Sequence, residues 1–290
     1  MDQATRLRNL IKSQEVRKSV ATVITVTSGK GGVGKSNMSV NLAIQLHNLG
    51  KRVIILDADF GLANVEVMFG IRPSYSLADL MFKNKELKDI ICPGPRGIGI
   101  ISGGSGIQEM ANLTRYQIEN LTSKLYELDE LADVIIIDTG AGISDAVLEF
   151  VVNSTEVILV ATPEPTSITD AYALLKTVNK RADYDKTKPI RMITNRVDSI
   201  RDGEELFDKL NVVVNRFLDV KIEYLGAVPQ DSNVSKAVMR QVPFSIAYPD
   251  THATNAIGHI AEKLLGNKLN TQTEKKGITY LFSKFMHRRQ

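Results

Sequence analysis

One stretch near the start of the chain has the residues of a phosphate-binding loop. Residues 28–36 read SGKGGVGKS, which contains Gly, four residues, Gly, Lys and Ser in that order. Glycines let successive backbone N–H groups point at phosphate oxygens, and a following helix offers its positive end. In such a loop Lys35 would neutralise the β and γ phosphates, and Ser36 would ligate Mg²⁺. The predicted phosphate contacts are Gly29, Lys30, Gly31, Gly32, Val33, Gly34, Lys35, Ser36 and Asn37.

Two acidic sites follow apolar runs typical of buried strands. Asp57 and Asp59 come after the run VIIL, and Asp138 comes after VIII. A carboxylate at such a strand end lies within reach of Mg²⁺ and the terminal phosphate, and a glycine-containing turn after it can respond to hydrolysis. The alternative role is that of an N-cap for the next helix, which would not exclude metal contact.

The elements that must position these residues alternate along the chain. Runs rich in Val and Ile predict strands at 22–27, 52–57, 98–102, 133–138, 156–161, 190–194 and 222–228. Helical patterns occupy 34–49, 114–128, 166–181, 204–218 and 251–265. Near-continuous apolar strands separated by helices are typical of a parallel sheet covered on both faces. We therefore predict an α/β fold with a doubly wound, mostly parallel sheet and ligand sites at the carboxyl ends of its strands.

Lys30 is a second lysine, at a position where most phosphate loops carry no charge. With it, residues 30–36 resemble the deviant Walker A signature of the MinD and ParA family of P-loop ATPases. The resemblance implies that Lys30 reaches across a homodimer to the phosphates of the partner's nucleotide. A cation supplied in this way would make the closed dimer conditional on ATP.

The same resemblance assigns roles to the other site residues. It implies that Asp59, together with Lys30 and Lys35, is catalytic and positions or activates the attacking water. Ser36, Asp57 and Asp138 would serve Mg²⁺, the two aspartates through its water shell. Short matches also imply a base pocket, although each could be an ordinary turn; its residues would be Asn195, Pro229, Gln230 and Asp231.

Charge divides the chain into three parts. The formal net charge is +3, but residues 1–20 carry +3 and residues 268–290 carry +5, so residues 21–267 carry −5. An acidic body argues against a general nucleic-acid binder, and two basic ends favour contacts with anionic surfaces or acidic partners. We divide the chain into an arm at 1–20, an ATPase domain at 21–266, and a linker and helix at 267–290.

The basic C-terminal end contains one amphipathic helical pattern. Its apolar residues recur at offsets of 0, 3, 4, 7 and 8, which places them on one helical face: Ile278, Leu281, Phe282, Phe285 and Met286. The flanking cations include Lys284, Arg288 and Arg289. This pattern predicts a helix that lies in the plane of an anionic membrane surface. The alternative is a helix packed on its own domain or on a partner, and the two states can alternate.

The N-terminal arm resembles the activator motif of the FlhG family, the MinD-like regulators of flagellar number. The resemblance rests on Asp2, Gln3 and Ala4 followed by Leu7 and Arg8. It implies that the arm engages the GTPase FlhF and stimulates GTP hydrolysis, with Gln3 nearest the chemistry. A disordered basic tail is the alternative.

These features together predict an ATPase that uses Mg²⁺, converts ATP to ADP and forms a homodimer with ATP. We expect a cytoplasmic protein, reversibly peripheral on the inner face of the cell membrane, because no apolar run is long enough to cross a bilayer. Expected partners are FlhF, flagellar switch (C-ring) proteins and anionic lipid. Alternatives are a division-site MinD, a ParA-type DNA-segregation ATPase, and a metal-cluster carrier, although one cysteine, Cys92, does not provide a thiolate pair.

Overall fold

The computed structural model describes residues 20–59, 64–83, 85–104, 124–125, 127–266 and 277–287. Its strands are β1 (Thr22–Thr27), β2 (Val53–Ala58), β3 (Cys92–Pro93), β4 (Gly99–Ser102), β5 (Val134–Thr139), β6 (Glu156–Ala161), β7 (Ile190–Val197) and β8 (Ile222–Pro229). They form an eight-stranded sheet in the order β3-β4-β2-β5-β1-β6-β7-β8. All neighbouring pairs are parallel except β3 and β4. The predicted fold class is confirmed, and the short antiparallel β3 is the strand that the sequence did not predict.

The helices are α2 (Lys35–Asn48), α3 (Asn64–Phe69), α4 (Leu77–Phe82), α5 (Leu87–Ile90), the 3-10 turn η1 (Pro95–Gly97), α8 (Asp145–Asn153), α9 (Pro165–Asn179), α10 (Ile200–Phe217), α11 (Ser232–Met239), α12 (Phe244–Ala247), α13 (His252–Gly266) and α14 (Ile278–His287). Four of the five helices predicted for the domain are found with small changes of bounds. Most of the fifth, at 114–128, lies outside the described residues. None of the described helices is both long and apolar enough to cross a membrane.

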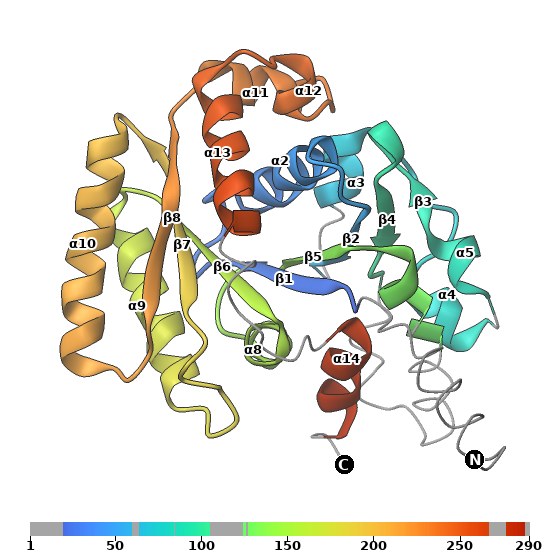
Figure 1. Cartoon of the computed structure of the whole chain (residues 1–290), viewed down its shortest axis with the longest axis horizontal. Coiled ribbons are helices and arrows are strands. Elements are labelled where there is room, and N and C mark those ends of the chain that lie inside the picture. The colour runs from blue at the N-terminus through green and yellow to red at the C-terminus, as the bar shows by residue number, and fades with distance from the viewer. Residues whose placement is uncertain are drawn as a thin grey trace, which may run out of the picture.

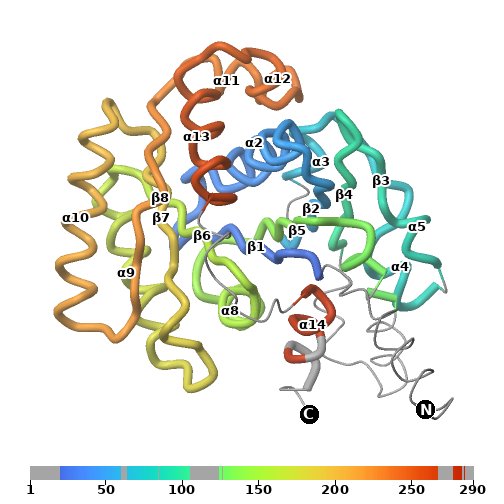
Figure 2. Tube along the Cα trace, viewed as in Figure 1, coloured from blue at the N-terminus to red at the C-terminus, as the bar shows by residue number. Residues whose placement is uncertain are grey.

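Helices cover both faces of the sheet (Figures 1 and 2). Successive residues of a strand point to opposite faces, so Ile24 and Val26 of β1 pack with α2 and α13, whereas Val23 packs on the other side. That other side carries α4, α5 and α14, which pack with residues of β1, β2, β4 and β5. Helix α8 lies against β1 and β5, α9 against β6, and α10 against β7 and β8. The two buried faces explain why the strands read as continuous apolar runs.

Helix α10 begins four residues before its predicted start. Ser199 caps it by accepting a hydrogen bond from the Asp202 backbone N–H at 3.2 Å. Gly203 lies inside the helix, at a position where no side chain fits: a Cβ there would stand 2.5 Å from Thr194 Oγ1 and 2.6 Å from Ala227 Cβ. The glycine therefore lets α10 lie close against β7 and β8 instead of ending the helix.

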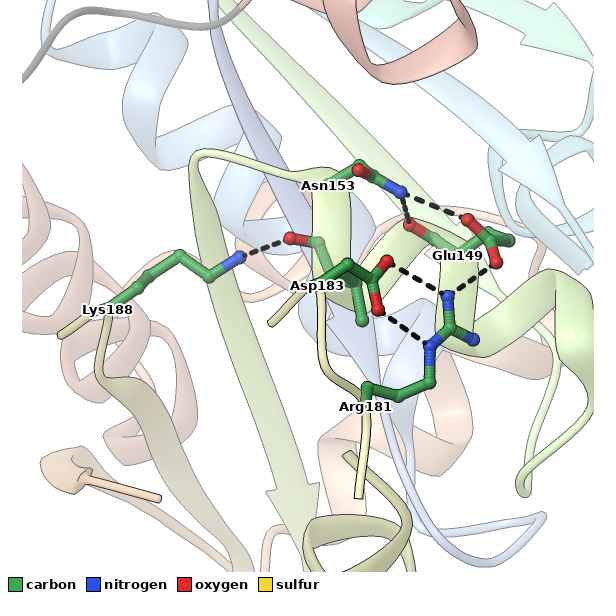
Figure 3. Close-up of polar contacts among 6 residues, drawn as sticks. Glu149, Asn153, Arg181, Asp183 and Lys188 are labelled. Carbon is green, nitrogen blue, oxygen red and sulfur yellow. Dashed lines mark hydrogen bonds and ion pairs between the residues drawn. The ribbon is translucent and has the colours of Figure 1, made fainter. Parts of the chain in front are cut away.

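A polar network holds the C-terminal half of α8 in place (Figure 3). Buried Glu149 accepts hydrogen bonds from Arg181 Nη2 at 2.6 Å and Asn153 Nδ2 at 3.1 Å. Arg181 also pairs with Asp183 at 3.0 Å. Lys188 Nζ donates to three carbonyls at the C-terminus of α8, at 2.9 to 3.1 Å. These contacts join α8 to the end of α9 and to the loop before β7, so we assign the network to stability.

Candidate functional site

The phosphate loop connects β1 to α2 with a backbone that requires glycine at several positions. Gly32 and Gly34 have φ angles of 79° and 96°, in the left-handed region. A Cβ on Gly34 would stand 2.5 Å from Asn195 Nδ2, and one on Gly29 would stand 2.1 Å from the Asp170 backbone. No side chain caps α2 and its first turn has no acidic residue. Its first N–H groups are thus available to an anion.

Lys35 and two aspartates meet beneath this loop. The Lys35 side chain is almost buried, and Asp138 is completely buried. Asp138 Oδ1 accepts a hydrogen bond from Ser39 Oγ at 2.7 Å, whereas its Oδ2 has no hydrogen-bond partner among the described residues. Burial raises the pKa of Asp138, against the opposite influence of the Ser36 and Ser39 hydroxyls and the Lys35 charge. Burying a charged carboxylate oxygen without a partner is costly, so a cation bound next to Asp138 Oδ2 would stabilise this side chain.

Asp57 stands directly beside Asp138 in the register of β2 with β5. Burial, and then the charge of Asp138, raise the pKa of Asp57 to about 7. Asp57 accepts backbone N–H groups of Asp59 and Val65, each at 3.1 Å. Two adjacent buried carboxylates next to a serine hydroxyl are the oxygen donors that Mg²⁺ prefers. The set therefore fits the Mg²⁺ assignment of Ser36, Asp57 and Asp138.

The N-cap alternative applies to Asp57 and not to Asp138. Val65 lies in the first turn of α3, so the Asp57 carboxylate binds the start of that helix as well as facing the site. The helix after β5, α8, is capped by Ser144, which accepts from Val147 N. Asp138 therefore does not cap α8, and its carboxylate contacts Ser39 and faces the site.

Asp59 lies between the two acidic strand ends. Its Oδ2 accepts a hydrogen bond from Asn64 Nδ2 at 3.1 Å. A Cβ on Gly140 would stand 3.4 Å from Asp59 Oδ1, so the carboxylate lies against the turn that follows β5. Asn64 orients the carboxylate, a role that the sequence did not single out.

Lys30 is held within its own chain at the rim of the site. Its Nζ lies 2.7 Å from Glu164 Oε2 and donates to Thr166 Oγ1 at 2.8 Å. Glu164 immediately precedes Pro165 at the start of α9. The hydrogen bond and charge of Lys30 lower the pKa of Glu164. Both side chains are partly exposed, at 35% and 53%, and exposed ion pairs contribute little to stability. Lys30 can therefore exchange Glu164 for another anion.

The predicted base-pocket residues come together around one cavity of about 520 Å³. It is lined by Gly34, Asn37, Asn195, Pro229, Gln230 and Asp231, with Arg196 and apolar residues of α11 beside them. Asn195 Nδ2 donates to the Val33 carbonyl at 2.8 Å, which joins the pocket to the phosphate loop. The sequence did not indicate Val234, Val238 or Met239, since α11 itself was not predicted.

The C-terminal helix exists as α14, but its apolar face is turned to protein. Ile278, Leu281 and Phe282 are completely buried, and the Phe282 ring meets Phe150 of α8 edge-on at 6.2 Å between centroids. In this conformation those three residues do not face lipid, so the structure describes the docked alternative. Lys284 is exposed. The side chains of Phe285 and Met286, and residues Arg288 and Arg289, lie outside the described part.

Asp2, Gln3, Ala4, Leu7 and Arg8 of the predicted activator motif also lie outside the described residues.

Comparison with known proteins decides the family. A family model described as "ParA: NUBPL iron-transfer P-loop NTPase" matches residues 19–265. The chain belongs to the MinD/ParA family of P-loop ATPases. It is 46% identical to "Antiactivator FleN" of Pseudomonas aeruginosa over 242 residues, covering 83% of this chain and 85% of the relative. It is 33% identical to "Flagellum site-determining protein YlxH" of Helicobacter pylori over 295 residues, covering 98% of each chain.

Solved MinD/ParA structures share the fold. A chain of the "MinC:MinD cell division protein complex" of Aquifex aeolicus has a TM-score of 0.66 and 24% identity, covering 89% of this chain and 99% of that one. Septum site-determining MinD of Pyrococcus horikoshii, complexed with Mg-ADP, has a TM-score of 0.65 and 24% identity, covering 87% and 100%. The family membership makes the protein an ATPase, and use of a nucleotide with Mg²⁺ agrees with the residues at its site.

Proposed function

We propose that this MinD/ParA ATPase regulates flagellar number or placement, as an FlhG-type switch that forms a dimer on ATP and then binds the membrane. The flagellar part of the proposal rests on the similarity to FleN and YlxH. We further propose that the protein is cytoplasmic and reversibly peripheral on the inner face of the membrane, where it meets FlhF and flagellar C-ring components.

The observation that carries the dimer proposal is the position of Lys30. It stands at the rim of the site, away from the buried Lys35, and is held by exposed Glu164 and Thr166. A nucleotide bound to a second copy would present phosphates with more negative charge than one carboxylate. Exchange of Glu164 for those phosphates would make the dimer depend on ATP.

The proposed hydrolysis depends on position and charge. The N–H groups of the phosphate loop and Lys35 would hold the phosphates, and Lys30 of the partner would add charge across the interface. Ser36, Asp57 and Asp138 would hold Mg²⁺, which neutralises charge on the β and γ phosphates when bound. Asp59, oriented by Asn64, would position the attacking water.

The membrane proposal rests on α14. Residues 278–286 have the apolar face of an interfacial helix, and Lys284 is exposed beside it. We expect deletion of residues 275–290 to remove co-sedimentation with anionic vesicles while ATP-dependent dimerisation persists. The deletion also uncovers Phe150. Lys284→Glu is therefore the matched variant, because it changes only a charge on α14. It should weaken binding to anionic vesicles and leave binding to zwitterionic vesicles unchanged. Full binding by the deleted chain would refute the membrane role.

The proposed activity toward FlhF separates an FlhG-type regulator from a division-site MinD or a ParA-type DNA ATPase. FlhF is the GTPase, and the N-terminal arm of this protein is proposed to stimulate it. We expect Gln3→Ala, or removal of residues 1–19, to abolish that stimulation without changing the ATP turnover of this protein. Asn9→Ala in the same arm serves as the control. Unchanged stimulation by both altered chains would remove this reason for preferring an FlhG-type function. DNA binding that survives loss of both ends would favour the ParA type.

A further inference from the structure

The start of α14 is bound by a carboxylate that lies far away in the sequence. Asp129 belongs to helical residues 127–131, just before β5. Its Oδ1 accepts the Ile278 backbone N–H at 3.1 Å, and its Oδ2 accepts the Thr279 hydroxyl at 2.9 Å and the Thr279 N–H at 3.5 Å. Asp129 is itself only 6% exposed. A negative charge at a helix N-terminus also meets the positive end of the helix dipole.

Gly277 makes this close contact possible. A Cβ at that position would stand 2.3 and 2.5 Å from the two Asp129 carboxylate oxygens and 2.4 Å from Val20 Cγ1. Space, and not backbone conformation, therefore requires glycine here. Any side chain would push the start of α14 away from Asp129.

The apolar contacts of α14 begin immediately after this polar contact. Ile278, Leu281 and Phe282 belong to the same buried cluster as Phe150, and α14 lies beside α8 (Figure 1). The helix cannot leave this cluster and keep its hydrogen bonds to Asp129. Separation of α14 from Asp129 is thus part of any movement that brings the three apolar residues to lipid.

We propose that Asp129 and Gly277 form a catch that holds α14 on the ATPase domain and keeps its apolar face from the membrane. The proposal deepens, and rests on, the membrane function proposed above. Burial raises the pKa of Asp129, and hydrogen bonds from Thr279 and Ile278 act in the opposite direction. The helix therefore offsets part of the cost of burying the carboxylate. Without Asp129, the docked helix would bury N–H groups that lack acceptors.

The catch can be tested by hydrogen–deuterium exchange on the full chain without nucleotide or vesicles. Gly277→Ala and Asp129→Ala should each speed exchange in residues 278–287 by about tenfold or more, because loss of even one buried hydrogen bond shifts docking on that order. Gly266→Ala is the matched control, since a Cβ there meets nothing within 4 Å. The same variants should bind anionic vesicles without ATP, unlike the unaltered chain.

The two measurements separate the catch from the membrane function. Faster exchange with vesicle binding supports both, whereas faster exchange with no vesicle binding, either without ATP or with it, supports the catch and refutes the membrane role. Exchange as slow as in the unaltered chain overturns the catch. If Asp129→Ala does not fold, Gly277→Ala decides alone, because its methyl group adds no strain once α14 has left.

Discussion

Asp59→Ala is expected to bind ATP as tightly as the unaltered chain and to hydrolyse it slower by a factor of about 100 or more. The loop after β1 and Lys35, which we propose hold the phosphates, are left in place by this substitution. The lost carboxylate is the one that Asn64 orients against the turn after β5. The ATP-bound chain should then accumulate as a dimer. Phosphate release and titration with a fluorescent ATP analogue measure the two effects separately.

Asp219→Ala provides the control for this variant. Asp219 is an exposed aspartate that pairs with Lys186 at 2.6 Å, at the end of the sheet opposite the site. The Asp219→Ala variant should leave both ATP turnover and ATP binding unchanged. Turnover by Asp59→Ala at the normal rate, or an ATP complex that stays monomeric, would contradict the role given to Asp59.

Lys30→Ala should lose ATP-dependent dimerisation while it still binds ATP. Truncating one member of a desolvated charge pair costs about 2–5 kcal/mol, and a symmetric dimer contains the contact twice. We therefore expect the dimer dissociation constant to rise by at least about 1,000-fold. Light scattering over a concentration series measures this change, and ATP turnover should fall with the dimer.

The matched control is Lys186→Ala, which removes another partly exposed lysine from a 2.6 Å ion pair with a carboxylate. This variant should dimerise normally. If Lys30→Ala dimerises as well as Lys186→Ala does, then Lys30 acts only within its own chain, through Glu164.

The sheet and the phosphate loop were predictable because their signals are local. Strands buried on both faces appear as unbroken runs of Val and Ile, and the loop is a contiguous pattern after such a run. Asp57 and Asp138 followed from the same reasoning, since parallel strands bring their carboxyl ends to one edge. The register that pairs these two residues directly needed the structure.

The helices that were missed are mostly short. Helices α3, α4, α5 and α12 have four to six residues, too few for a helical period to stand out. Their stability comes from tertiary packing and capping, as in α4, where Ser76 and Asp79 form a capping box. Such contacts depend on the fold and not on the local pattern alone.

The partners of the functional residues were hidden for a different reason. Glu164 and Lys30 are 134 positions apart, and Asp129 and Ile278 are 149 apart. No local spacing connects them. The apolar face of α14 was visible in the sequence. A helix on a lipid surface and a helix in a protein groove both need such a face, so the sequence could not distinguish the membrane-bound helix from the docked one.

The central claim is that ATP joins two copies of this chain. The most direct test is the mass in solution of the unaltered chain and of Asp59→Ala, by light scattering with ADP and with ATP. We predict 32.0 kDa with ADP for both, and twice that mass for Asp59→Ala with ATP. A mass of 32.0 kDa in every condition, or a dimer that forms equally with ADP, would contradict the account.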